Sequence, residues 1–240
     1  MVVHRPLDDD LERLRALLLK MTDTVDAQFS LGVQALLERN VEQAERVIQG
    51  DRKVDALELE IDDLCERILA RQQPVARDLR LLVTAIKITT DIERIGDHCK
   101  SLARNVADIQ YAPDLLRETQ FTDMVDESRR MLRQAQDAFQ TGDALLARKV
   151  IARDQHVNRI HGDNFDALVA AIKEHPEHAE AGAHMIAANK AIERIGDHVK
   201  NIAESIVFLI EGKDIRHRGL QHEASTEGGA GDGAETSPAE

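Results

Sequence analysis

Apolar residues recur at alternating steps of three and four along most of the chain, which is the spacing typical of amphipathic helices. The clearest run keeps this spacing without interruption at Leu81, Ala85, Ile88, Ile92, Ile95, Cys99, Leu102 and Val106. A helix of about 30 residues is about 45 Å long, so this run predicts a long rod. Two similar runs precede it. The first half of the chain is therefore expected to form three helices, over residues 7–38, 41–71 and 74–106.

The same pattern begins again after Pro113. Pro74 and Pro176 stand in equivalent turns, and the segment ERNVEQAERVI aligns with TGDALLARKVI. The seam of the last helix returns as Met185, Ala188, Ile192, Ile195, Val199, Ile202, Ile206 and Leu209. This repetition indicates that a three-helix unit of roughly 100 residues has been duplicated. The second set of helices is expected over residues 115–140, 143–174 and 177–210.

We therefore predict an all-α, elongated protein made of two tandem three-helix bundles, over residues 1–111 and 112–212. The remaining residues, 213–240, form an acidic, Gly-rich tail with almost nothing to bury. Such a composition predicts disorder.

Composition supports an all-helical core, because hydrophobic residues make up 42% of the chain but aromatic residues only 2%. The net charge of −13 disfavours nucleic acid as a partner and favours cations or a protein with a basic face. The two cysteines, Cys65 and Cys99, are expected as buried small hydrophobes in a reducing compartment. No signal peptide or apolar run of membrane-spanning length is present, so we predict a cytoplasmic protein without membrane insertion.

The heptapeptide IERIGDH occurs twice, from Ile92 to His98 and from Ile192 to His198. Its isoleucines lie on the seam, so packing explains their repetition. Gly96 and Gly196 are best explained by the close approach of a neighbouring helix. Glu93 and Asp97, by contrast, are four residues apart and face outward. As like charges at this spacing they cost roughly 0.2–0.5 kcal/mol, so packing does not account for their repetition.

The preceding helix of each half supplies an acidic or polar ridge that faces this motif. In the first half the ridge is Asp51, Asp55, Glu58 and Asp62, and in the second it is Asp154, Asn158 and His161. Neighbouring antiparallel helices would bring Asp51 and Asp55 beside Glu93 and Asp97, and Asp154 and Asn158 beside Glu193 and Asp197. Clustered carboxylates need neutralising, which a metal ion does well. Oxygen ligands suit Fe, Mn, Mg or Ca, and the nearby histidines also allow Zn.

The doubled motif, the run QQPVARDLRLLVTAIKITTDIERIGDH and its second copy KAIERIGDHVKNIAESI resemble the PhoU family. The resemblance covers about residues 7–217. It implies two tandem three-helix bundles with multinuclear iron or zinc clusters on the surface, in a protein that is commonly a homodimer. It also implies a negative regulator of phosphate-starvation signalling and of phosphate uptake. The implied partners are the ATPase subunit of the phosphate transporter and a phosphate-sensing histidine kinase of the PhoR type.

By matching positions, the resemblance implies metal residues in both halves: Asp51, Asp55, Glu93 and Asp97, then Asp154, Asn158, Glu193 and Asp197. Asn158 stands where the family has an acid, so the second site is expected to bind metal less tightly. The turn HPEHAEAGAH also departs from the first-half pattern PVARDLR.

Two other kinds of protein remain as alternatives. A ferritin-like di-iron oxidase or iron store would use Glu-x-x-His pairs that face a bundle core, and the sequence has none. A metal-free scaffold would need its charges only for solubility, although repeated outward acids argue against it. No Walker loop, nucleophile elbow, HExxH or CxxC motif is present, so we predict a protein that is not an enzyme.

Overall fold

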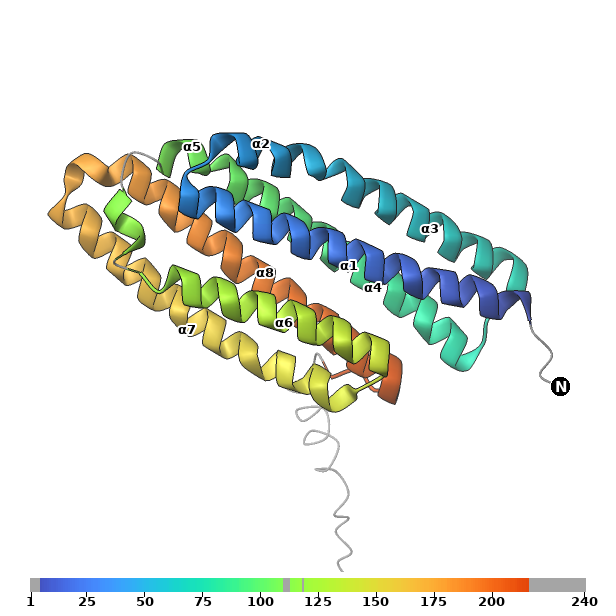
Figure 1. Cartoon of the computed structure of the whole chain (residues 1–240). Coiled ribbons are helices and arrows are strands. Elements are labelled where there is room, and N and C mark those ends of the chain that lie inside the picture. The colour runs from blue at the N-terminus through green and yellow to red at the C-terminus, as the bar shows by residue number, and fades with distance from the viewer. Residues whose placement is uncertain (1–4, 110–112, 118, 216–240) are drawn as a thin grey trace, which may run out of the picture.

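The computed structural model describes residues 5–109, 113–117 and 119–215, and every regular element within those ranges is a helix (Figure 1). The first bundle is formed by α1 (Pro6–Glu38), α2 (Val41–Gly50), α3 (Arg52–Gln72) and α4 (Ala76–Arg104), and is followed by the short α5 (Val106–Ile109).

The second bundle contains three long helices and two short 3₁₀ segments. They are η1 (Pro113–Leu116), α6 (Phe121–Thr141), α7 (Ala144–Glu174), η2 (Pro176–His178) and α8 (Ala179–Glu211). Figure 1 shows both bundles as elongated sets of antiparallel rods. The predicted all-α fold of two tandem three-helix bundles is confirmed.

The apolar seams of the two long helices form the core. Every predicted seam position of α4 and of α8 is buried, with Ile92 at 1% and Ile192 at 0% exposure. On α4 the buried surface extends beyond the seam to Leu82 and Thr89, because this helix packs against both α1 and α8. The opposite faces of the helices are charged, and none of the described helices has the length and apolarity needed to cross a bilayer.

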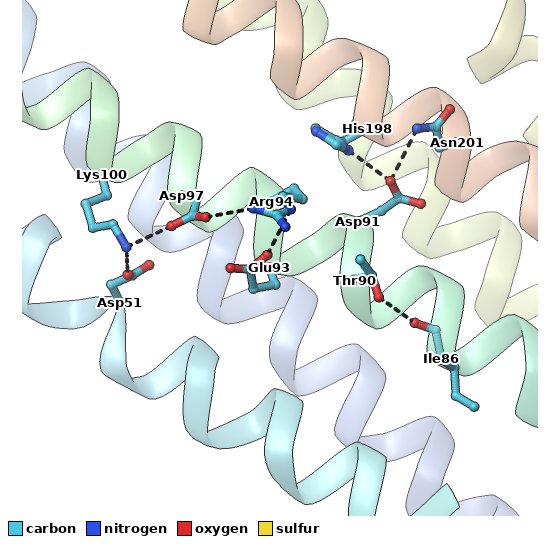
Figure 2. Close-up of polar contacts among 10 residues, drawn as sticks. All are labelled: Asp51, Ile86, Thr90, Asp91, Glu93, Arg94, Asp97, Lys100, His198 and Asn201. Atoms are coloured by element: carbon cyan, nitrogen blue, oxygen red, sulfur yellow. Dashed lines mark hydrogen bonds and ion pairs between the residues drawn. The ribbon is translucent and has the colours of Figure 1, made fainter.

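Helices α4 and α8 run antiparallel and join the two bundles (Figure 1). The equivalent side chains His98 and His198 meet there, with ring centroids 5.4 Å apart. Nδ1 of His198 lies 2.9 Å from Oδ1 of Asp91, and the amide of Asn201 donates to the same oxygen at 3.3 Å (Figure 2). The residue equivalent to Asp91 in the second bundle is Ala191. The interface is therefore nearly symmetric in its backbone but carries this polar contact on one side only.

The turns that open the second helix of each bundle are built alike. Asn40 accepts a hydrogen bond from the backbone N–H of Gln43 at 3.0 Å, and Asp143 accepts one from Leu146 at 2.9 Å. Each cap satisfies a backbone donor that the first helical turn leaves free. The sequence alignment of these two turns is thus confirmed.

Two predicted helices differ from the structure. The run expected from residue 115 to 140 is divided: η1 ends at Leu116, and α6 begins only at Phe121. The buried side chain of Asn164 accepts a hydrogen bond from the backbone N–H of Gln120 at 2.7 Å, which fixes where α6 begins. The run expected from residue 41 to 71 is interrupted at Asp51, between α2 and α3.

The two cysteines are unpaired and buried, as predicted. Burial, assisted by the charge of Asp62, raises the pKa of Cys65 to about 11. Burial also raises the pKa of Cys99. A thiol is a weak nucleophile and a weak ligand until it loses its proton, so both side chains act as core residues.

Candidate functional site

The repeated heptapeptide places its acidic pair beside the start of the neighbouring helix. Glu93 and Asp97 lie half-buried on the outer face of α4, and Asp51 enters from the junction of α2 and α3 as a buried carboxylate. Gly96 permits this approach: a Cβ there would lie 3.4 Å from Oδ1 of Asp51 and 3.5 Å from Cγ1 of Val54. The prediction that the motif glycine marks a close approach between helices is therefore confirmed.

A lysine ammonium holds the first group of acids together (Figure 2). Nζ of Lys100 contacts Oδ1 of Asp97 at 2.8 Å and also binds Oδ2 of Asp51. Arg94 covers the outer side, with Nη1 3.4 Å from Asp97 and Nε 3.4 Å from Glu93. We call Asp51, Glu93, Asp97 and Lys100 the first cluster.

The protonation of this cluster follows from burial and charge. Burial, together with the charge of Asp97, raises the pKa of Glu93 to about 7, so this carboxyl group donates a hydrogen bond to Asp97. Burial alone would raise the pKa of Asp97 too, but the hydrogen bond and charge of Lys100 lower it. The pKa of Glu58 on α3 is raised by burial and by its acidic neighbours, which include Asp97. The cluster thus carries the ammonium of Lys100 and, below about pH 7, a proton on Glu93.

This protonation gives a measurable pH dependence. Folding favours the protonated form of Glu93, so its contribution to stability is complete below the unfolded pKa of about 4.5 and is lost as pH rises through about 7. Because this carboxyl is partly solvated, we expect a difference of about 1 kcal/mol. When the pH is raised from about 5 to about 8, the unfolding free energy of Glu93→Gln should increase by that amount relative to that of the metal-free wild type. Denaturant unfolding at both pH values measures it.

The exposed Glu66 of α3 provides the control. Glu66→Gln should track the wild type at both pH values. Burial lowers the pKa of His98 and of His161, so both histidines make the protein more stable at higher pH. This contribution is the same in the variant and in the wild type, and it therefore cancels when the two are compared. If the difference in unfolding free energy between Glu93→Gln and the wild type were the same at both pH values, the raised pKa of Glu93 would be wrong.

The second bundle repeats the arrangement with differences. Asp154 of α7 is almost fully buried, and its Oδ2 accepts hydrogen bonds from Nζ of Lys200 at 2.9 Å and from the amide of Asn158 at 3.1 Å. Its other oxygen, Oδ1, is buried and has no hydrogen-bond partner among the residues that the structure describes. Glu193 is paired with Nζ of Lys190 at 2.6 Å, and Asp197 with Arg194 at 3.3 Å. We call Asp154, Glu193, Asp197 and Lys200 the second cluster.

The two clusters differ in how their lysines are used. Lys100 contacts both Asp51 and Asp97, whereas Lys200 binds Asp154. As a result the pKa of Asp197 is raised, first by burial and then by the charges of its acidic neighbours, while that of Asp97 is lowered. Asp197 of the second cluster is therefore less neutralised by its lysine than Asp97 of the first cluster is.

Six of the eight residues predicted as metal ligands are brought into these clusters, and the other two lie at their margins. Asp55 is exposed one turn further along α3, where its charge helps to raise the pKa of Glu58. Asn158 is also exposed but is hydrogen-bonded to Asp154. The residue that sequence reasoning left out of the site is Glu58, although it belongs to the same ridge of steps of three and four.

The donor set fits a hard or borderline cation in chemistry, although the side chains as they stand do not form a complete cage. No group of three or more Asp, Glu, His or Cys side chains converges as a metal site among the residues that the structure describes. Between Asp51 and Asp97 the cation position is taken by the ammonium of Lys100. The buried, unpartnered oxygen of Asp154 is an acceptor still available to a cation.

Fold and site together define a class of all-helical, duplicated proteins that carry an acid–lysine cluster in each of two three-helix bundles. The chain belongs to the PhoU family: the family model of the PhoU domain matches residues 18–106 and again residues 121–206. This confirms the resemblance inferred from the repeated motif.

Similar proteins of known name also belong to the PhoU family. The chain is 36% identical over 220 residues to the phosphate-specific transport system accessory protein PhoU homolog of Pseudomonas putida, covering 91% of this chain and 86% of that protein. It is 35% identical over 219 residues to the homolog of Pseudomonas aeruginosa, covering 91% and 90%. The family is one of accessory proteins, which confirms the prediction that the chain is not an enzyme.

Solved structures share the fold. The crystal structure of PhoU from Pseudomonas aeruginosa aligns with a TM-score of 0.78 at 34% identity, over 86% of this chain and 99% of that one. The phosphate transport system regulatory protein PhoU from Streptococcus pneumoniae also aligns with a TM-score of 0.78, at 24% identity, over 87% of this chain and 99% of that one. At that identity the second likeness concerns the fold alone.

Proposed function

We propose that this chain is a cytoplasmic, metal-binding negative regulator of phosphate-starvation signalling and of phosphate uptake. Its proposed partners are the ATPase subunit of the phosphate-specific transporter and a phosphate-sensing histidine kinase. The observation that carries the proposal is the repetition of outward acids in a chain whose curated relatives are accessory proteins of phosphate transport. The apolar seams explain the isoleucines of the motif but do not explain why its outward acidic pair is repeated.

Metal binding is proposed at both clusters. Asp51, Glu93 and Asp97 would supply oxygen donors in the first, and Asp154, Glu193 and Asp197 in the second. Iron or zinc is the leading expectation, with manganese or magnesium also compatible with oxygen ligands. A bound cation would neutralise carboxylates that now depend on a shared proton and an ammonium. Asp55 and Asn158 would complete the ligand shells from the neighbouring helix.

The regulatory role would use these clusters as parts of a contact surface. Both lie on outer helix faces, where the exposed parts of the acids are accessible to a partner. A long rod with acidic sites in both halves, in a chain of net charge −13, suits docking to basic protein surfaces. We also propose a homodimer, as the family resemblance implies.

Metal content tests the proposal first. Protein purified anaerobically and without chelators should contain iron or zinc, measured by elemental analysis. Glu93→Ala/Asp97→Ala and Glu193→Ala/Asp197→Ala should each lose the share of one cluster while keeping the helical circular dichroism of the wild type. The matched control, Glu42→Ala/Glu66→Ala, removes two exposed acids elsewhere on the first bundle and should retain all the metal. If the wild type and all the variants contained no metal, metal binding would be dropped from the proposal.

The partner contacts need a separate readout. Wild type and both double variants should be compared for co-purification with the transporter ATPase and the kinase, and for repression of a phosphate-starvation reporter. Loss of metal together with loss of repression would tie the clusters to regulation. A variant that lacks metal but still binds the ATPase and the kinase and still represses the reporter would show that the acids are not needed for regulation.

The ferritin-like alternative is not supported by the core. Among the residues that the structure describes, the buried polar side chains include no glutamate and no histidine. The acidic motifs lie on the outer faces of their helices rather than inside a bundle.

A further inference from the structure

A second polar feature lies away from both clusters, at the end of the molecule where α4 begins and α6 and α8 end (Figure 1). A pocket of ≈ 290 Å³ opens there between the two bundles. Its lining includes Arg15 of α1 and Arg77 of α4, with Phe139 and Thr141 from α6 and Leu209 from α8. Two guanidinium groups from one bundle thus face the helix ends of the other.

The two arginines repel each other, and neither forms an ion pair with a carboxylate of the described residues. Arg15 is half-buried, and its guanidinium lies 5.8 Å from the centre of the Phe139 ring. Burial lowers its pKa, and the neighbouring charge of Arg77 lowers it further. Asp78 acts in the opposite direction, but this carboxylate also has a contact with Arg5 at 3.7 Å. Neither Arg15 nor Arg77 forms an ion pair within the described ranges.

The helix ends compensate only part of this charge. The C-termini of α6 and α8 each carry roughly half a negative charge, or about one in total. Arg80 adds a third guanidinium at the same end. Its Nη1 lies 2.5 Å from where a Cβ on Gly212 would be, and its Nε is buried without a hydrogen-bond partner in the described part of the chain. Three guanidinium groups against about one negative charge from the helix ends and one from Asp78 leave an excess of about one positive charge, on a chain whose net charge is −13.

We propose that this pocket is an anion site that binds inorganic phosphate through the guanidinium groups of Arg15 and Arg77. The planar fork of arginine matches the oxygens of phosphate and forms charge-assisted hydrogen bonds with them. The volume leaves room for an inorganic phosphate ion together with its nearest waters. Such a site goes beyond the proposed function, because it would let the chain respond to phosphate without a metal or a partner protein.

Calorimetric titration of the full-length, metal-free chain with inorganic phosphate tests the inference, with ionic strength held constant by chloride. We expect saturable binding to the wild type. Arg15→Gln/Arg77→Gln should weaken the affinity at least about tenfold, since each lost guanidinium removes charged hydrogen bonds. The matched control is Arg13→Gln/Arg46→Gln, which removes two exposed arginines of α1 and α2 that pair with Glu60 and Glu42. It should bind like the wild type.

Two results would overturn the site: the absence of saturable phosphate binding to the wild type, or an equal loss in both double variants. If Arg15→Gln/Arg77→Gln fails to fold, Arg77→Gln alone decides, because this side chain is exposed and should still weaken binding several-fold. Because the titrated protein contains no metal, a negative result here would not bear on the proposed metal binding or regulation, which are tested by separate measurements.

Discussion

Replacement of Lys100 by methionine should have opposite effects on the metal-free and the metal-bound protein. Without metal, the variant leaves the buried carboxylate of Asp51 without its ammonium, and we expect the free energy of unfolding to fall by about 2 kcal/mol. With Mn²⁺ as the probe, the same variant should bind about tenfold more tightly, because the ammonium no longer competes for the oxygens of Asp51 and Asp97. Denaturant unfolding and Mn²⁺ titration of chelator-treated protein measure the two effects.

The control for Lys100→Met is Lys53→Met, which removes an exposed lysine at the start of α3. It should leave both quantities close to the wild type. A Lys100→Met protein that is destabilised but binds Mn²⁺ no better would show that Lys100 is only a structural counter-ion. The proposed overlap between the ammonium and a metal ion would then be wrong.

Replacement of Asn189 by leucine should cost about 3 kcal/mol of unfolding free energy. This fully buried amide of α8 accepts a hydrogen bond from the amide of Asn164 at 3.1 Å and donates to the backbone carbonyl of His161 at 3.0 Å. Leucine has a similar volume but removes both hydrogen bonds, and it leaves the buried amide of Asn164 with only the sulfur of Met124 as an acceptor, at 3.8 Å. Because Asn164 also holds the backbone of Gln120, we expect the start of α6 to loosen as well. Denaturant unfolding and amide hydrogen exchange measure these effects.

The duplicated fold offers a matched control at Thr89, the position on α4 equivalent to Asn189. The hydroxyl of Thr89 is buried and has no hydrogen-bond partner. Thr89→Val therefore removes an unsatisfied group and should be neutral or slightly stabilising. A large loss of stability in Thr89→Val, or none in Asn189→Leu, would contradict the different roles assigned to the two positions.

The fold could be predicted from the sequence because long helices repeat their apolar positions many times. The seams of α4 and α8 are buried at every predicted position. The beginning of α6 could not be predicted, because it depends on a hydrogen bond between Gln120 and Asn164, which are 44 residues apart. Periodicity reports which face of a helix is buried, but contacts of this kind decide where a helix starts.

The candidate site was predictable in part. As expected, the structure brings Asp51 close to Asp97 through Lys100, and Asp154 close to Asp197. Asp55 and Asn158, which were expected there too, are exposed at the margins. The sequence did not indicate that the ammonium of Lys100 lies between the carboxylates of Asp51 and Asp97. Side-chain placement at this level depends on the separation of two helices, which the close approach at Gly96 sets and which no spacing rule supplies.

The antiparallel contact of α4 with α8 bears on the origin of the molecule. Equivalent positions face one another across it, as the neighbouring rings of His98 and His198 show. A single repeat expressed alone would leave the interface side of its last helix uncovered, and a second copy of the same repeat has the shape to cover it. The packing of the two bundles within one chain is therefore like that of a homodimer of two repeats. Because the two repeats lie in one chain, each can carry its own side chains at equivalent positions, as Asp91 opposite His198 and Ala191 at the equivalent position show.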